Sequence, residues 1–348
     1  MRDMLVNPHR GKGLPELSPL PLSDASAVAR LLGMCPAHAQ TPLRDVPELA
    51  GLAGVARIHV KDERGRMGLG SFKALGAAYA IARQAAAAVR DDDWASSLVG
   101  RVFVTASAGN HGLSVAAGAR VFGAKAVIYL SEAVPEAFVA RLAAMGAQPV
   151  REGATYEASM AAAERAAATN GWTLLSDSSW PGYTELPLRV MEGYLQMAAE
   201  AVSQIDAPPT HILLQAGVGG LAGAVAAHAR SVWGDDPTII VVEPEAAPAL
   251  IESIRAGRIV TTEGPVSDMG RLDCKTPSMI ALAGLARDAD LFVTISEEEA
   301  ASGIAKLAEV GLETTPSGGA ALAALLSGLD LDADARVLAI ISEGPVDA

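Results

Sequence analysis

Short apolar runs alternate with longer alanine-rich runs along most of the 348 residues of this chain. Residues 102–108 and 211–217, for example, have the length and composition of buried strands, and each precedes a segment with the spacing of a helix. This alternation predicts an α/β fold with mostly parallel sheets and helices on both faces. The length suits two domains or one large body, and ligand sites in such folds lie at the carboxyl ends of strands.

The acidic net charge of the chain argues against nucleic acids and anionic membranes as binding partners. A net charge of -13 disfavours a nucleic-acid surface, which needs a basic stripe, and gives no attraction to anionic membranes. The N-terminus lacks the apolar core of a signal peptide, and no uninterrupted apolar run is long enough to span a bilayer. The two cysteines, Cys35 and Cys274, form no disulfide framework. We therefore expect a cytoplasmic protein that binds neither nucleic acid nor membrane.

A glycine loop follows the apolar run that ends near residue 215. The backbone amides of five consecutive residues could wrap an anion at the start of the next helix: Gly217, Val218, Gly219, Gly220 and Leu221. The same loop could instead be a tight turn without a ligand. It could also be a dinucleotide site, since Gly217, Gly219 and Ala222 fit the pattern G-x-G-x-x-A. Glu243 ends the next strand at about the spacing of a ribose-binding acid.

An asparagine-containing loop, "TASAGNHG" at 105–112, also joins a strand to a helix. Its amides could hold a second anion such as a substrate carboxylate, and the Asn110 side chain can hydrogen-bond a phenolic oxygen. The candidate substrate-binding residues are Ser107, Ala108, Gly109 and His111. As local structure alone, Ser107 is a helix N-cap, Asn110 a turn residue and His111 a structural hydrogen bonder.

Lys73 lies between Phe72 and a helix-forming run for which Ser71 is the expected N-cap. Burying an ammonium ion is costly, but such a lysine can form a Schiff base with an aldehyde cofactor, of which pyridoxal phosphate is the common one. Desolvation is expected to lower its proton affinity and make it a usable base. The six histidines lack metal-ligand spacing, and neither a serine-hydrolase elbow nor a Walker A sequence occurs. We expect no metal site.

Together these segments resemble the fold type II pyridoxal-phosphate enzymes, the tryptophan synthase β-like family, from residue 61 to the C-terminus. "GSFKALG" resembles their Schiff-base segment, "SAGNHG" their substrate-carboxylate loop, "GVGGL" their phosphate cradle and "IISEGPVD" the segment whose serine bonds the pyridine nitrogen. The resemblance implies that Lys73 holds the cofactor and acts as a base, that Asn110 contacts its phenolic oxygen, and that Ser342 contacts its ring nitrogen.

The same resemblance implies an architecture. We expect two three-layer αβα domains with mostly parallel sheets and pyridoxal phosphate in the cleft between them. The larger, cofactor-binding domain would comprise residues 1–75 and 190–348, and the smaller, mobile, substrate-binding domain residues 76–189. A homodimer is also implied.

Two further stretches resemble a narrower group, the diaminopropionate ammonia-lyases. "DSSWPGYTELPLRVMEGY" at 177–194 is similar to their D-x-x-W-x-G-Y-x-E-x-P stretch, and "MGRLDCKTPS" at 269–278 to their M-x-x-L-x-C-x-x-P stretch. The implied reaction is α,β-elimination from a small L-amino acid such as 2,3-diaminopropionate, giving pyruvate and ammonia, with Asp177 as a catalytic residue. By local pattern alone Asp177 is a turn residue before a helix, and Trp180 and Tyr183 are core residues.

One position departs from the pattern of that group. Ala108 stands where the ammonia-lyases have an aspartate and serine-racemising relatives have a serine. Because alanine cannot carry a proton, the departure predicts action on the L-isomer with little or no use of the D-isomer and no racemisation. It also keeps open a serine, threonine or hydroxyaspartate dehydratase of the same fold. A dinucleotide-binding oxidoreductase is the more distant alternative.

Overall fold

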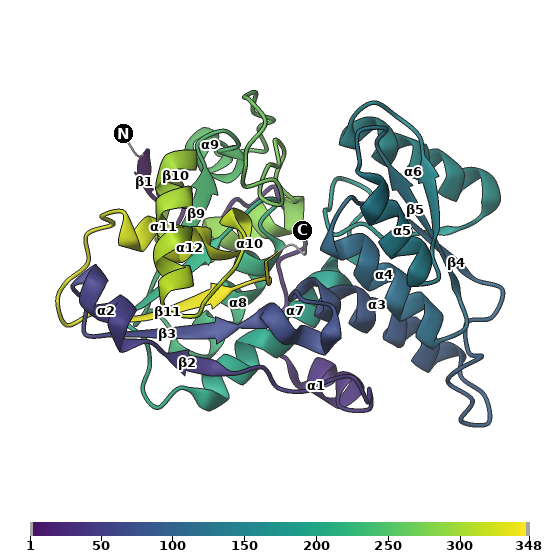
Figure 1. Cartoon of the computed structure of the whole chain (residues 1–348), viewed down its shortest axis with the longest axis horizontal. Coiled ribbons are helices and arrows are strands. Elements are labelled where there is room, and N and C mark those ends of the chain that lie inside the picture. The colour runs from purple at the N-terminus through teal and green to yellow at the C-terminus, as the bar shows by residue number, and fades with distance from the viewer. Residues whose placement is uncertain (1–2, 346–348) are drawn as a thin grey trace.

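The computed structural model describes residues 3–345 and contains two sheets, each at the centre of one lobe (Figure 1). The larger sheet runs in the order β1-β10-β9-β8-β11-β3-β2. Its strands are β1 (Met4–Val6), β2 (Leu43–Asp45), β3 (Arg57–Asp62), β8 (His211–Gln215), β9 (Thr238–Pro244), β10 (Leu291–Ile295) and β11 (Arg336–Ile341). The edge strands β1 and β2 are antiparallel to their neighbours, and the remaining pairs are parallel.

The smaller sheet has four parallel strands in the order β6-β5-β4-β7. They are β4 (Val102–Ala106), β5 (Lys125–Leu130), β6 (Gln148–Arg151) and β7 (Thr173–Leu174), with helices α4 (Asn110–Val121), α5 (Glu136–Ala144) and α6 (Tyr156–Asn170) between them. Side chains alternate between the two faces: Phe103 and Ile128 pack in the cluster that contains α4 residues, while Val104 and Val127 pack with α6. Helices therefore cover both faces, as predicted.

The remaining helices surround the larger sheet or join the lobes. They are α1 (Ser26–Leu32), α2 (Pro47–Ala53), the 3-10 helix η1 (Glu63–Gly68), α3 (Lys73–Ala88), α7 (Glu185–Gln204), α8 (Gly220–Trp233), α9 (Ala249–Ala256), α10 (Met279–Asp288), α11 (Glu297–Glu309) and α12 (Pro316–Leu326). Within the described residues, none of these helices is long and apolar enough to cross a membrane.

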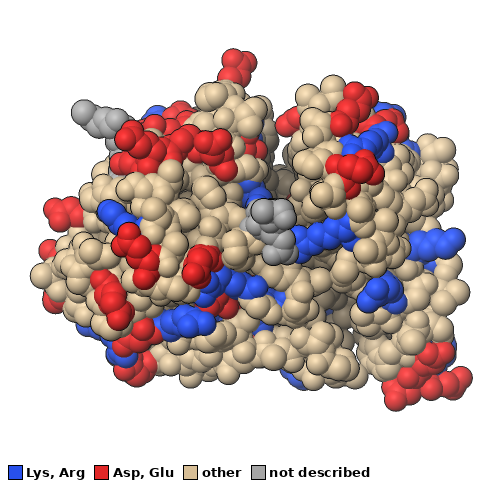
Figure 2. Space-filling view, viewed as in Figure 1, with Lys and Arg blue, Asp and Glu red and all other residues tan. Residues whose placement is uncertain are grey.

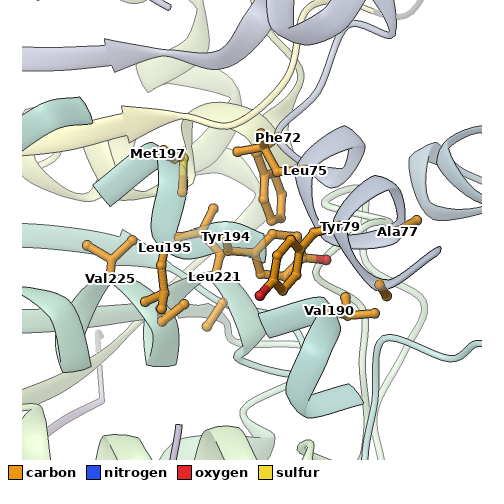
Figure 3. Packing of buried hydrophobic residues seen from close by; sticks show 14 of the residues in the cluster. Phe72, Leu75, Ala77, Tyr79, Val190, Tyr194, Leu195, Met197, Leu221 and Val225 are labelled. Carbon is orange, nitrogen blue, oxygen red and sulfur yellow. The ribbon is translucent and has the colours of Figure 1, made fainter. Parts of the chain in front are cut away.

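Helices α3 and α7 pack closely where the two lobes meet. A Cβ on Gly76 of α3 would lie 2.5 Å from Tyr194 Cε1, and one on Gly193 of α7 would lie 2.6 Å from the carbonyl oxygen of Leu75. Figure 3 shows Tyr194 among Phe72, Leu75 and Val190, and the Phe72 and Tyr194 ring centroids are 4.8 Å apart. Since α3 also packs on α4 and α7 on α8, this pair links the cores of both lobes and fixes the start of α3.

The predicted α/β class is confirmed. Helix α3 is assigned from Lys73, but Phe72 before it already has helical φ and ψ of -54° and -25° and makes no capping bond. Ser71 Oγ accepts a hydrogen bond from the Lys73 amide at 3.2 Å, which is the capping role predicted for Ser71. All strands of the smaller sheet lie within 76–189 and those of the larger one outside it, but the domain limits themselves stay a prediction.

Candidate active site

The predicted site residues follow the carboxyl ends of five strands. Lys73 comes after β3 and η1, the asparagine-containing loop after β4, Asp177 after β7, the glycine loop after β8, and Ser342 directly after β11. In Figure 1 the arrows of β3 and β11 point toward the second lobe. The fold therefore directs these segments to the junction of the lobes.

Lys73 and Asp177 form an ion pair across this junction. The Lys73 Nζ donates a hydrogen bond to Asp177 Oδ2, and the two side chains are 22% and 17% exposed. The ammonium also lies 5.2 Å from the ring centroid of Phe72 and 5.8 Å from that of Tyr194. The pair joins the first residue of α3 to the loop after β7 of the smaller sheet.

The prediction that burial lowers the pKa of Lys73 is wrong. Burial does disfavour the ammonium, but the negative charge of Asp177 outweighs it and raises the pKa of Lys73. Likewise burial favours the protonated carboxyl of Asp177, but the Lys73 charge and then His111 hold its pKa well below the usual value. Sequence reasoning considered desolvation alone, because the partner lies about a hundred residues away.

The Lys73 segment is joined to the segment after β11 by backbone hydrogen bonds. The Phe72 amide donates to the Ser342 carbonyl, and the Gly344 amide donates to the Gly70 carbonyl, both at 3.0 Å. Ser342 is only 5% exposed. Two predicted cofactor-binding residues, Lys73 and Ser342, are thus held next to each other by the main chain.

The asparagine-containing loop forms a hydrogen-bonded turn at the start of α4. Ser107 Oγ accepts from the amides of Gly109 at 3.2 Å and Gly112 at 3.0 Å, and Gly109, not Ser107, is the helix N-cap. The buried His111 bonds the Leu175 carbonyl through Nε2 at 2.8 Å, which agrees with a structural role for its ring. Ala108 is exposed, and Asn110 donates to Glu343 from Nδ2.

The glycine loop turns directly into the start of α8, where the prediction places an anion. Gly219 is the N-cap of α8 with φ of 95°, a left-handed conformation that favours glycine. A Cβ on Gly217 would lie 3.0 Å from both Cys274 Sγ and Leu272 Cα, so the 269–278 segment packs directly on the loop. The Ser278 amide also donates to the Val218 carbonyl at 3.0 Å.

Glu243 does not support the dinucleotide alternative. Its side chain is fully buried, and its two carboxyl oxygens accept from the amides of Leu250 at 2.7 Å and Ile251 at 2.8 Å at the start of α9. Burial raises the pKa of Glu243 to about 8. Glu243 therefore caps a helix instead of facing a ribose.

The two stretches with the most specific sequence patterns touch each other. Ser179 and Ser278 hydroxyls are 2.7 Å apart, the Met279 amide donates to the Ser179 carbonyl at 2.9 Å, and the Ile280 amide donates to Ser179 Oγ at 2.9 Å. This seam attaches the loop that carries Asp177 to the start of α10.

Trp180 and Tyr183 stiffen the same loop. Their rings stack with centroids 4.4 Å apart, and Tyr183 Oη donates to the Leu174 carbonyl at 2.9 Å and accepts from the Ser176 amide at 3.1 Å. These contacts orient the segment on both sides of Asp177, so the pair acts as local structure that positions the carboxylate.

Sequence reasoning missed Glu343 and Arg271. The Glu343 carboxylate is 4% exposed and accepts from Asn110 and Thr315, while Arg271 Nε lies 2.9 Å from its Oε2. Asn110, Arg271 and Glu343 line one cavity of about 710 Å³. The signal available was an acidic residue two positions after a buried strand, but only the fold shows which groups it meets.

The residues present fit pyridoxal phosphate. Lys73 supplies an amine, the glycine loop supplies amides at a helix start for a phosphate, and the buried Ser342 adjoins the lysine segment. Which of these residues touch the cofactor stays a prediction.

Comparison with known proteins places the chain among enzymes with this cofactor. It matches the family model described as pyridoxal-phosphate dependent enzyme over residues 34–343. It is 33% identical to the diaminopropionate ammonia-lyase of Salmonella typhimurium over 347 residues, covering 89% of this chain and 86% of that one. The crystal structure of the Escherichia coli diaminopropionate ammonia-lyase with D-serine superposes with a TM-score of 0.89 at 30% identity, covering 100% of this chain and 95% of that one. The Mus musculus L-serine dehydratase/L-threonine deaminase is 29% identical over 292 residues, covering 83% of both chains.

Proposed function

The chain belongs to the pyridoxal-phosphate dependent enzymes, and we propose that it is an ammonia-lyase for a small L-amino acid of the 2,3-diaminopropionate type. The net reaction converts 2,3-diaminopropionate and water to pyruvate and ammonia, with both amino groups released. An enzyme of this kind breaks the bond from the α-carbon to hydrogen and the bond from the β-carbon to nitrogen.

When bound, pyridoxal phosphate supplies an aldehyde that condenses with amines and a conjugated ring that withdraws electrons from the α-carbon. Lys73 holds the cofactor through Nζ and, once freed, takes the α-proton. The amides of 217–221 would hold the phosphate, and Ser342 would contact the ring nitrogen. The amides of 107–111 hold the substrate carboxylate, and Asn110 contacts the phenolic oxygen.

The observation that carries the proposal is the Lys73–Asp177 ion pair. In this pair the Asp177 carboxylate accepts a hydrogen bond from the Lys73 ammonium, which supports a role for Asp177 in binding a cationic group. A β-ammonium group of the substrate has the same chemistry. Asp177 would hold this group and return a proton to it as it leaves.

A dehydratase for serine, threonine or hydroxyaspartate is the second candidate. Ala108 supports it, because the ammonia-lyase pattern has an aspartate at that position. The leaving group would then be a hydroxyl, which gains less from a carboxylate partner than an ammonium does.

Ala108 also underlies the proposed stereochemistry. With no proton-carrying side chain there, only Lys73 exchanges the α-proton, and we expect ammonia from the L-isomer with little or none from the D-isomer. Ala108→Asp is expected to raise ammonia release from D-diaminopropionate. Robust release from the D-isomer by the unchanged protein would contradict the proposal.

The assembly and location follow from the resemblance alone. We propose a homodimer in the cytoplasm, which light scattering on the purified protein and localisation of the tagged protein would test.

A substrate panel tests the function. The yellow holoenzyme is incubated with 2,3-diaminopropionate, serine, threonine and hydroxyaspartate, and ammonia and oxo-acid are measured. Diaminopropionate is expected to give the highest kcat/KM, and the yellow colour is expected to be lost in Lys73→Ala. A preference for a hydroxy-amino acid would favour the dehydratase, and a colourless protein that takes up a dinucleotide would overturn the whole proposal.

A further inference from the structure

Arg271 lies at the mouth of the cleft with most of its hydrogen-bond donors unused. Its backbone amide donates to Ser317 Oγ at 3.1 Å, which fixes the segment, and its Nε lies 2.9 Å from Glu343 Oε2. Within the described residues, no further partner of the guanidinium is found. A guanidinium carries five N–H donors, so the two Nη groups remain open on a side chain that is 37% exposed.

Arg271 adjoins, through its Nε, the loop predicted to bind the substrate carboxylate. A Cβ on Gly109 would lie 3.9 Å from Arg271 Nε. Asn110, the next residue, donates to the same Glu343 oxygen that pairs with Arg271. Arg271 therefore lies beside the amides that begin α4, although it belongs to the irregular segment between α9 and α10.

Other arginines of the same cavity differ in their partners. Arg64 donates from all three of its side-chain nitrogens, to Asp62 and to backbone carbonyls of 311–313. Arg141 of α5 is exposed and has no ion-pair partner among residues 3–345. Arg64 is thus occupied by its own lobe and Arg141 has no charged partner, whereas Arg271 is oriented by one ion pair and is otherwise open.

Figure 2 shows Lys and Arg side chains beside the groove between the lobes, on a chain whose net charge is -13. The cavity at this groove is lined by four arginines and three carboxylates: Arg44, Arg64, Arg141, Arg271, Asp62, Glu313 and Glu343. The lining thus has one more positive than negative side chain, which favours an anionic group there over the acidic surface elsewhere.

We propose that Arg271 is a specificity-determining residue: together with the amides of 107–111 it binds the carboxylate of the amino-acid substrate, through its two Nη groups, while Glu343 pairs with its Nε. A planar fork with two parallel donors matches a carboxylate, and the ion pair with Glu343 reduces the side-chain freedom lost on binding. The inference rests on the proposed function, because it takes an amino acid as the ligand.

The test compares two ligands that cannot undergo elimination. L-Alanine and L-alaninamide are titrated into the holoenzyme, and binding is followed by the change in the cofactor's absorption. In Arg271→Gln the Kd of L-alanine is expected to rise about 10- to 100-fold, while that of L-alaninamide changes little. Arg271→Lys keeps the charge but loses the fork, and is expected to recover only part of the preference for the carboxylate.

Arg141→Gln is the matched control, since it removes the same charge from the same cavity. It is expected to change both Kd values by no more than about threefold, as an exposed charge without contact would. Equal weakening of both ligands by Arg271→Gln, or an Arg141→Gln effect as large on L-alanine, would overturn the proposal. If Arg271→Gln does not fold, the same two Kd values are measured for Arg271→Lys. A preference of Arg271→Lys for L-alanine over L-alaninamide equal to that of the unchanged protein would then overturn the proposal.

Failure of the proposed function would look different. The unchanged holoenzyme would then release no ammonia from 2,3-diaminopropionate, whatever its preference between L-alanine and L-alaninamide. If the unchanged enzyme is active and Arg271→Gln retains its KM, only the role of Arg271 is lost. A higher KM with little change in kcat supports it.

Discussion

Lys61 and Lys73 lie close in the sequence and each pairs with a carboxylate, yet their surroundings differ. The Lys61 side chain is fully buried, and its Nζ donates to the Thr41 carbonyl at 2.7 Å, Glu200 at 2.8 Å and Gln204 at 2.9 Å. All three of its donors are used. Lys73 is 22% exposed and has its charged partner Asp177 on the other side of the cleft.

The difference separates a charge that holds the fold from one that is available for chemistry. Around Lys61, the buried Arg66 also donates to Glu63 and to both oxygens of Glu200, so each charge has several partners. Arg66 belongs to η1, which leads directly to the Lys73 segment. The hydrogen-bonded network around Lys61 and Arg66 thus fixes η1, and with it the start of the segment that leads to Lys73.

The largest expected effect is the loss of activity on replacing Lys73, the partly exposed lysine of this pair. Lys73→Ala is expected to lower kcat by about 10³-fold or more, because it removes both the amine that holds the cofactor and the base. The far-ultraviolet circular dichroism should be unchanged, since the lost pair faces the cleft. A variant that retains a tenth of the activity would show that Lys73 is not the reactive lysine.

Lys61→Met is expected to lower the stability of the fold and to leave the activity nearly unchanged. Removing one member of a buried ionic network is expected to destabilise the fold by about 3–5 kcal/mol. The urea midpoint should fall, while kcat of the remaining folded protein at saturating pyridoxal phosphate should stay within about threefold of normal. A loss of kcat without a loss of stability would mean that Lys61 takes part in the chemistry.

The free energy of unfolding at acid pH should depend on the ionisation of Glu200. Burial alone would favour its protonated form, but hydrogen bonds and charges of Arg66 and then Lys61 lower its pKa from 4.5 to about 2. A depressed carboxylate stabilises the fold above its unfolded pKa, and that contribution, about 3 kcal/mol, is lost as the pH falls from about 4.5 toward 2. Urea unfolding of Glu200→Gln should lack this slope, whereas the exposed-site control Asp206→Asn should keep it.

The smallest expected effect concerns the leaving group. Asp177→Asn is expected to lower kcat for 2,3-diaminopropionate by about 10- to 100-fold, because a neutral amide no longer attracts the β-ammonium. The loss on L-serine should be smaller, since a hydroxyl carries no charge. Equal losses on both substrates would indicate that Asp177 only positions Lys73.

Much of the site was predictable because the fold class fixes where strand exits meet. Lys73, Asn110, the loop at 217–221 and Ser342 each follow a predicted apolar strand, and parallel strands present their carboxyl ends at one edge. The roles given to these residues came from the family resemblance and not from spacing.

What the sequence could not show depends on contacts between distant segments. The raised pKa of Lys73 and the meeting of Asn110 with Glu343 arise from partners that only the folded chain brings near. Helix α12 was not predicted, since its Gly318 and Gly319 disfavour a helix locally and tertiary packing decides there. The three-residue strands β1 and β2 are too short to show a period.

The pairing of β11 has a consequence for how the protein is made. β11 lies between β8 and β3, and the segment after it bonds the backbone at Gly70 and Phe72. During synthesis Lys73 leaves the ribosome long before these partners exist, so β3 must wait unpaired on that side. Among the described residues β11 comes last in chain order of the strands of the larger sheet, so this sheet and the backbone contacts of the Lys73 segment are completed only after residue 344 has been made.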